Sequence, residues 1–298
     1  MDTEPGASLL SEIIHSMILF GVLALVMNGI ARSQGFFHLP PPQNTRSHQY
    51  SPRLSQVLSC FSIYLGYSLF FAPILSKITE YFFSFFFHHR PPLILFSWIQ
   101  LITVSLTLLS LYAYSQSRDD YLLKKVLKDY SIDNPSSKTV DFIEGSMTWI
   151  LGFPIAAFVG QACDLFIYLL AGIQSYEQVA VRYLKMTIDS PFMLSIALFT
   201  IIIAAPVTEE FIFRGMLQNW LKTKLGTKSA IITASACFAL FHLSSSQGLG
   251  NISLALSLFS FACFLGFIYE KKGSLYASIG LHMTFNAVST LRILFSSN

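Results

Sequence analysis

Two adjacent carboxylates open the stretch of this 298-residue chain that is best suited to chemistry. Glu210 precedes Arg214 by four residues, so on a helix the two side chains share a face and can form an ion pair. Glu209 points about 100° away and has no cationic partner in this pattern. It is therefore free to act as a general base. Alternatively, both acids are interfacial residues at the end of a helix.

Each of two later segments contains a histidine with a second notable residue four positions away. Phe238 precedes His242, and His282 precedes Asn286, so the members of each pair share a helical face. A single histidine in a membrane span is commonly a packing residue whose ring nitrogens already have hydrogen-bond partners. Three polar clusters between residues 209 and 286, each with an aromatic neighbour, are instead interpreted as parts of one site.

These residues lie among long apolar stretches. The chain is 53% hydrophobic and 12% charged, whereas an ordinary soluble domain is about 25% charged. A soluble fold is thereby excluded, and a net charge of +3 without a long basic run argues against a nucleic-acid partner. We expect an all-α, polytopic bundle of about eight transmembrane helices. Their expected positions are Leu9–Ala31, Gln56–Ser76, Leu93–Ser115, Met147–Gly172, Phe192–Thr208, Ala230–Ser244, Ile252–Tyr269 and Leu275–Phe295.

The expected spans divide the chain into two parts. Residues 1–189 form N-terminal transmembrane helices and loops, and residues 190–298 form a core of four transmembrane helices that carries all three polar clusters. The first span has no positively charged start and no evident cleavage site, so we expect it to be retained. Glu12, His15 and Asp164 in the early spans are expected to support the fold or the substrate path. The four cysteines are interpreted as small buried hydrophobic residues.

Helix lengths predict that two of the clusters meet. Glu209 precedes Lys224 by 15 residues and His242 follows Lys228 by 14, so both stand roughly 21–22 Å from the turn between them. In an antiparallel helical hairpin they lie at the same depth. His282 is roughly 13 Å from its own turn. This mismatch closes if the first hairpin projects beyond the bilayer.

The chain resembles the CPBP family through three motifs that occur in order on successive spans. They are Glu-Glu-x-x-x-Arg at 209–214, Phe-x-x-x-His at 238–242 and His-x-x-x-Asn at 282–286. This family comprises the type II CAAX prenyl endopeptidases and the related bacteriocin-processing and immunity proteins. The resemblance covers roughly residues 190–295. It implies an eight-helix intramembrane endopeptidase that cuts near the C-terminus of prenylated proteins, with the first glutamate and the histidines as catalytic groups.

The resemblance and the residue chemistry together suggest a role for each side chain. Glu209, helped by His242, takes a proton from the water that attacks the scissile carbonyl. His282 and Asn286 donate hydrogen bonds to the oxyanion that forms. The expected supporting residues are Glu210, Arg214 and Phe238.

A metal-dependent alternative uses the same residues. Glu209, His242 and His282 could bind one zinc ion, which is the His₂Glu set of thermolysin-type enzymes. The sequence leaves open whether the site needs no cofactor or one divalent metal, with a slight preference for the metal-free version. The His-Glu-x-x-His, Gly-x-Gly-Asp and Gly-x-Ser-x-Gly motifs of other proteases do not occur in the sequence.

Two other functions remain open at this point. The chain could be a non-catalytic scaffold or bacteriocin immunity protein of the same family, although its motifs are intact. It could also be a transporter in which Glu12, His15 and Asp164 relay protons, although no inverted repeat is visible. The expected partners are the bilayer and a lipidated or membrane-associated protein or peptide substrate. The expected location is the plasma membrane of a prokaryote or the endoplasmic reticulum of a eukaryote.

Lysine and arginine predict the orientation of the chain. Alternating spans place 13 of these residues in the odd-numbered loops and 5 in the others. By the positive-inside rule, the loops at 32–54, 118–145, 215–228 and 271–273 lie in the cytoplasm and both termini lie outside. A membrane-impermeant thiol reagent should label Lys125→Cys only from the cytoplasmic face and Lys185→Cys only from the opposite face. Labelling of Lys125→Cys from the outer face alone would contradict this orientation.

Overall fold

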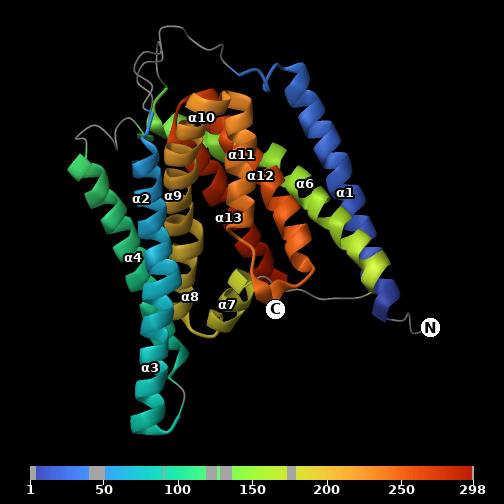
Figure 1. The fold of residues 1–298 in the computed structure, drawn as a ribbon. Coiled ribbons are helices and arrows are strands. Elements are labelled where there is room, and N and C mark those ends of the chain that lie inside the picture. Colours follow the sequence, from blue (N-terminus) through green and yellow to red (C-terminus); the bar gives the residue numbers. More distant parts are fainter. Residues whose placement is uncertain are drawn as a thin grey trace.

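The structure of the chain is a computed structural model, and it describes residues 5–39, 51–89, 91–118, 126–127, 136–172 and 179–296. Helices make up the regular structure of these residues, which confirms the all-α prediction. Element labels follow Figure 1. The predicted orientation is not tested by the structure, and Lys125 lies outside the described residues.

Two long helices continue through several labelled segments. The first comprises α2 (Leu54–Leu65), the π-helical η1 (Gly66–Phe71) and α3 (Ala72–Phe87). The second comprises α8 (Pro191–Leu198), η2 (Phe199–Ala204), α9 (Ala205–Glu210), η3 (Phe211–Gln218) and α10 (Asn219–Leu225), in which η2 and η3 are π-helical. The remaining elements are α1 (Pro5–Ser33), α4 (Leu93–Arg118), α6 (Lys138–Ala171), α7 (Val179–Thr187), α11 (Thr227–Leu240), the 3₁₀-helix η4 (Ser245–Gln247), α12 (Gly250–Lys272) and α13 (Leu275–Ser296).

Six helices of the described chain are long and apolar enough to cross a membrane, so the chain is a multi-pass membrane protein. They are Leu10–Ser33, Leu54–Phe87, Leu93–Ser117, Lys138–Ala171, Pro191–Leu225 and Gly250–Lys272. Thr227–Leu240 is apolar but shorter, with 14 residues. The helix α13, which carries His282 and Asn286, is not among the six. A polytopic helical protein is thus confirmed, but the number of eight spans is not.

Two expected helix ends are wrong. The second helix continues to Phe87, well beyond residue 76, and the fifth continues to Leu225, well beyond residue 208. The charged side chains of Glu210 and Arg214 suggested that the fifth span ends near them. They are instead buried and paired with each other, so the helix passes through them without a break.

π-helical turns let both long helices pass a proline. Pro206 has no N–H, and in an α-helix its ring would clash with the carbonyl four residues earlier. The wider turn of η2 ends just before it, where the N–H of Ala205 binds Thr200 O, five residues back. Pro206 would be the next donor in this pattern, so Ile201 O has no donor within the helix. The π-helical η1 precedes Pro73 in the same way.

The C-terminal helices occupy the centre of the bundle (Figure 1). The helix α6 packs against α1 as well as against α12 and α13, and α4 lies beside the α2–α3 helix at the other edge of the bundle. Of the candidate spans, α12 is the most buried and α1 the least. The N-terminal helices therefore form outer walls around the elements that carry the three motifs.

The interpretation of the four cysteines as buried residues is confirmed only for Cys60. Cys60 on α2 is fully buried in the apolar cluster that also contains Phe213 and Phe238. Cys163, Cys237 and Cys263 are half-buried, and all four thiols are free.

Two glycines allow α6 and α13 to pack backbone against backbone. A Cβ added at Gly145 would overlap the carbonyl oxygen of Ala277, and a Cβ added at Gly280 would overlap that of Phe142. No side chain fits between the two helices at these positions. Because His282 follows Gly280 by two residues, this contact fixes the place of its imidazole.

Gly145→Ala should push α13 away from α6 and lower both stability and activity. Overpacking of this kind typically costs about 1–3 kcal/mol. Gly29→Ala on α1 is the matched control, because the Cβ position of Gly29 has open space around it and alanine favours a helix. Thermal unfolding in detergent should show a lower midpoint for Gly145→Ala and an equal or higher one for Gly29→Ala. An unchanged midpoint for Gly145→Ala would show that the helices separate without cost.

Candidate active site

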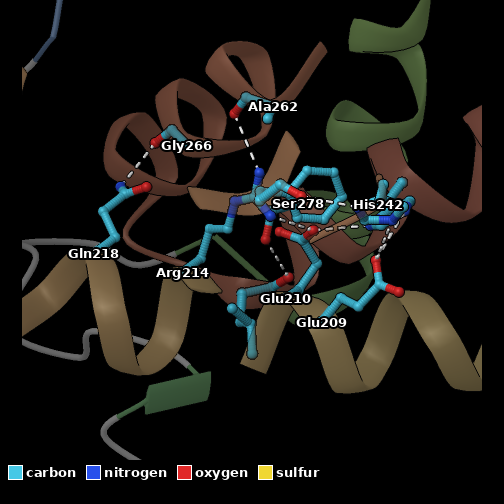
Figure 2. A network of polar contacts seen from close by, with 11 residues as sticks. Glu209, Glu210, Arg214, Gln218, His242, Ala262, Gly266 and Ser278 are labelled. Atoms are coloured by element: carbon cyan, nitrogen blue, oxygen red, sulfur yellow. Dashed lines mark hydrogen bonds and ion pairs between the residues drawn. The ribbon is translucent and has the colours of Figure 1, made fainter. Parts of the chain in front are cut away.

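A buried ion pair joins Glu210 to Arg214 (Figure 2). Arg214 Nη1 donates to Glu210 Oε1 at 2.9 Å, and both residues are fully buried. Arg214 Nη2 donates to the carbonyl oxygen of Ala262 on α12 at 3.2 Å. The predicted pairing is confirmed, although the residues after Glu210 form the π-helical η3 rather than an α-helix. The pair ties the end of α9 to α12.

Glu209 points away from this pair and toward His242 (Figure 2), and its carboxylate also faces His282. Its Oε2 lies 3.7 Å from His242 Nε2 and 3.8 Å from His282 Nε2. The side chain of Glu209 is 11% exposed, and no lysine or arginine of the described chain forms an ion pair with it. The structure thus brings together one residue from each of the three motifs, as the comparison of helix depths predicts for the first two.

His242 lies in the turn after α11 and not within a helix, which corrects the expected span to residue 244. The helix ends at Leu240, and the ring folds back so that Nδ1 lies 2.8 Å from Phe238 O. A carbonyl oxygen can only accept a hydrogen bond, so Nδ1 carries the proton and Nε2 of the neutral ring does not. The atom that faces Glu209 is therefore a proton acceptor.

The second carboxylate orients His282 in the same manner. Nδ1 of His282 lies 2.8 Å from Glu210 Oε1, the oxygen that also accepts from Arg214. Since the paired carboxylate accepts, Nδ1 is the donor and Nε2 faces Glu209. Nε2 of His282 can donate a hydrogen bond only in the imidazolium form. Glu210 is therefore the group that sets the orientation of this ring, in addition to pairing with Arg214.

Phe238 lies among the polar side chains of the site. Its ring centroid is 4.5 Å from that of His242 and 5.7 Å from that of His282. The guanidinium of Arg214 lies 4.6 Å from the same centroid, within the range of a cation–π contact. This single ring, which is only 1% exposed, therefore packs against all three groups.

Asn286 has a partner that its motif does not reveal. Its Nδ2 donates to Ile201 O at 2.8 Å, the carbonyl that Pro206 leaves without a helical donor. The side-chain amide has two N–H groups, so one is used to fasten α13 to η2 and one is left. A contribution of Asn286 to an oxyanion site stays a prediction.

The ionisable residues of the early spans lie apart from this cluster. Glu12 and His15 are exposed on α1, where His15 Nδ1 contacts Ser11 Oγ at 3.1 Å. Asp164 is half-buried on α6. Among the described residues, no hydrogen bond or ion pair joins these three side chains to Glu209 or to the two histidines.

The metal-dependent alternative concerns the same three convergent side chains. Within the part of the chain that the structure describes, no group of three or more His, Cys, Asp or Glu residues is arranged to hold a metal ion. Glu209 Oε2 nevertheless lies 3.7 Å and 3.8 Å from the Nε2 atoms of His242 and His282, so the metal-dependent alternative stays as the sequence analysis left it.

A second buried network, which the sequence analysis missed, joins the end of the α8–α10 helix to α12. Gln218 Nε2 donates to Glu270 Oε1 at 3.0 Å, and Lys222 Nζ donates to Glu270 Oε2 at 2.6 Å. Asn219 Nδ2 donates to the hydroxyl of Tyr269 at 2.7 Å. Gln218 and Asn219, which belong to the hairpin expected to project beyond the bilayer, are buried against α12, and the projection itself stays a prediction.

The sequence analysis also missed a cavity of about 440 Å³ that borders Glu209. Its walls come from the α2–α3 helix, α4, α7 and the α8–α9 segment. The signal was present in the sequence, because Tyr64, Ser68 and Ser76 recur at multiples of four residues and all three line the cavity. Glu209 thus touches the imidazoles and an open space large enough for a substrate segment.

Residues 191–288 match the family model described as type II CAAX prenyl endopeptidase Rce1-like. The match confirms the predicted CPBP resemblance over the segment that contains all three motifs. This part of the chain is therefore similar to the type II CAAX prenyl endopeptidases, and it lies within a multi-pass membrane protein. A search of curated proteins and a search of solved structures found no match to the chain.

Arg214→Met should destabilise the protein, because it leaves the buried carboxylate of Glu210 without its cation. Removal of one partner of a buried pair costs about 3–5 kcal/mol. Arg214→Lys is the matched control and should recover only part of this loss, since one ammonium cannot reproduce the fork that reaches both Glu210 and Ala262 O. Denaturant unfolding in detergent measures this order. Wild-type stability of Arg214→Met would contradict the role of the pair.

Proposed function

We propose that this chain is an intramembrane endopeptidase. It hydrolyses a peptide bond near the C-terminus of a lipidated, CAAX-type substrate or of another membrane-associated protein or peptide. The observation that carries the proposal is the convergence of Glu209 with Nε2 of His242 and His282, inside a segment that matches a prenyl endopeptidase family. A carboxylate and two oriented imidazoles are the groups that general acid–base hydrolysis requires.

The separations within the site suit a bridging water. At 3.7 Å, Glu209 Oε2 and His242 Nε2 are too far apart for a direct hydrogen bond, and both are acceptors. A substrate water that donates one hydrogen to each atom satisfies both. Such a water is held with its oxygen lone pairs directed away from the two acceptors and toward an incoming carbonyl carbon.

Glu209 takes one proton from this water while the oxygen attacks the scissile carbonyl carbon. The electron pair of the C=O bond moves to the carbonyl oxygen, which becomes an oxyanion. His282 in its imidazolium form and the remaining N–H of Asn286 donate hydrogen bonds to this oxyanion. Collapse of the tetrahedral intermediate breaks the C–N bond, and Glu209 returns its proton to the leaving amine. The products are a carboxylic acid and an amine, and Glu209 is again a carboxylate.

Glu210 is chemically identical to Glu209 but is already committed to other groups. Its Oε1 accepts from both Arg214 and His282, and the side chain is fully buried. It borders neither the cavity nor His242 Nε2. Glu210 therefore positions the base and the imidazole and does not itself take the proton.

Glu209→Gln should abolish cleavage with little loss of stability, because glutamine keeps the size and polarity of the side chain but is not a base. Loss of a general base typically costs about 10²–10⁴-fold in rate. Glu210→Gln should weaken the protein and lower activity only partly, since Arg214 and His282 then lack a charged acceptor. The measurement is turnover per folded molecule on one farnesylated peptide, in detergent.

Asp164→Asn is the control for this pair of variants. It changes a membrane carboxylate on α6 that lies apart from the cluster, so turnover should stay near the wild-type value. Substantial activity of Glu209→Gln, or complete inactivity of well-folded Glu210→Gln, would show that the two roles are reversed or shared. Failure of the wild-type protein to cleave any lipidated peptide would favour a non-catalytic scaffold.

A further inference from the structure

The segment between α11 and α12 carries one of the two imidazoles of the site. It runs from Phe241 to Leu249 and includes His242, two residues beyond the end of α11 at Leu240. Most of its residues are exposed, among them Phe241, Leu243 and Leu249. A segment with little burial keeps one conformation only where specific contacts hold it. The contacts that hold this segment therefore decide where His242 lies.

The backbone leaves the α-helical pattern at His242. In an α-helix, the N–H of His242 would bind Phe238 O, four residues back. It donates instead to Ala239 O at 3.2 Å, and Leu243 N donates to Leu240 O, three residues back, at 3.3 Å. Phe238 O is thereby left for the ring of His242, whose Nδ1 lies 2.8 Å from it. The proton on Nδ1, and with it the acceptor character of Nε2, depends on this end of the helix.

Asn251, in the first turn of α12, binds the main chain of this segment with both ends of its side-chain amide. Its Nδ2 donates to Ser244 O at 2.7 Å, and its Oδ1 accepts from Ser244 N at 3.1 Å. Ser244 is extended, with φ −135° and ψ 138°. Opposed residues of two antiparallel strands exchange a pair of hydrogen bonds in the same way. Here a side-chain amide takes the place of the second strand.

The two hydrogen bonds of Asn251 account for the end of α11. The sequence has no glycine or proline between Leu240 and Ser244, which are the residues that commonly end a helix. A residue held in the extended conformation cannot continue an α-helix. In the described part of the chain, no other side chain from outside residues 241–249 forms a hydrogen bond with the main chain of this segment. The extended conformation of Ser244 therefore depends on Asn251.

An aromatic contact holds the residue before His242. The ring centroid of Phe241 lies 5.4 Å from that of Phe61 on α2 and 5.4 Å from that of Phe213 on η3. This contact fixes the side chain of Phe241 but leaves the main chain after it free to turn. The hydrogen bonds of Ser244 set the direction of that main chain. His242 thus lies between an apolar contact on one side and the amide of Asn251 on the other.

We propose that Asn251 is a positioning residue for His242. Its amide holds Ser244 extended, so that α11 ends and Nε2 of His242 faces Glu209. Asn251 acts through the backbone and lies in none of the three motifs. The proposal rests on the proposed endopeptidase function and adds a residue on which its geometry depends. A displacement of about 1 Å at a catalytic group can cost about 10²-fold in rate.

Asn251→Leu should lower kcat by about 10–100-fold and leave KM close to the wild-type value, because leucine has a similar shape but no amide. The measurement is cleavage of a farnesylated peptide per folded molecule, in detergent. Asn251→Asp is the second variant. Its carboxylate still accepts from Ser244 N but cannot donate to Ser244 O, so kcat should also fall. If Asn251→Leu does not fold, Asn251→Asp decides, and a wild-type kcat in the folded variants would overturn the proposal.

Nitrogen NMR of the histidine rings reports the state of His242 without any turnover. With ¹⁵N-labelled histidine in alkaline buffer, the wild type should show the neutral tautomer with its proton on Nδ1, in a signal that is absent from His242→Gln. Asn251→Leu should show a mixture of the two neutral tautomers, because Phe238 O is no longer kept for Nδ1. A merely structural Asn251 would lower thermal stability without this change, and that result would overturn the proposal.

Asn28→Leu is the matched control. Asn28 on α1 is half-buried, as Asn251 is, and its Nδ2 also donates to the main chain, to Ala24 O at 3.0 Å and to Leu151 O at 3.2 Å. Neither hydrogen bond reaches the site, so kcat and the tautomer of His242 should keep their wild-type values. An equal loss of kcat in Asn28→Leu and Asn251→Leu would contradict a specific role of Asn251.

The two measurements separate this proposal from the proposed function. If the wild type cleaves no lipidated peptide but Asn251→Leu changes the tautomer of His242, the proposed function fails and the positioning of His242 stands. If the wild type cleaves and Asn251→Leu changes neither kcat nor the tautomer, the positioning alone fails.

Discussion

The buried pair of Glu210 and Arg214 is the interaction on which the rest of the site depends. Two charges removed from water are stable together only if close geometry and further hydrogen bonds offset their desolvation. Three other helices supply these contacts, through Ala262 O on α12, the ring of Phe238 on α11 and His282 on α13. The pair therefore fixes the positions of four helices relative to one another along the bundle. Glu209 meets the imidazoles at the same level.

Much of this arrangement follows from helical spacing and could be predicted. The interval of four residues predicts the pairing of Glu210 with Arg214. Equal distances from one turn predict that Glu209 lies beside His242. Both arguments use periodicity, which is local and survives even in a π-helical segment. The binding of His282 by Glu210 escaped prediction because it depends on how α13 sits against α9, and spacing within one helix does not encode that.

Other features could not be predicted because they depend on a weak helix-end signal or on contacts between different helices. His242 lies in a turn because α11 ends at Leu240, and the last turn of a helix has no strong sequence signal here. Asn286 looked like a free donor, but a proline on another helix leaves a carbonyl that it fills. The cavity is formed by four helical segments distant in the chain, so its polar residues appeared in the sequence as scattered packing hydroxyls.

The π-helical turns on either side of α9 make the length of this helix as important as its composition. Each such turn closes its hydrogen bond over one residue more than an α-helical turn does. Deletion of a single residue from η3 would allow an ordinary α-helical ladder, which the backbone accepts readily. A deletion between Glu210 and Arg214 would also shorten the interval over which they pair from four residues to three. Many side chains on the outer surface of this helix can be exchanged, but an insertion or deletion between these two residues changes the spacing on which their pair depends.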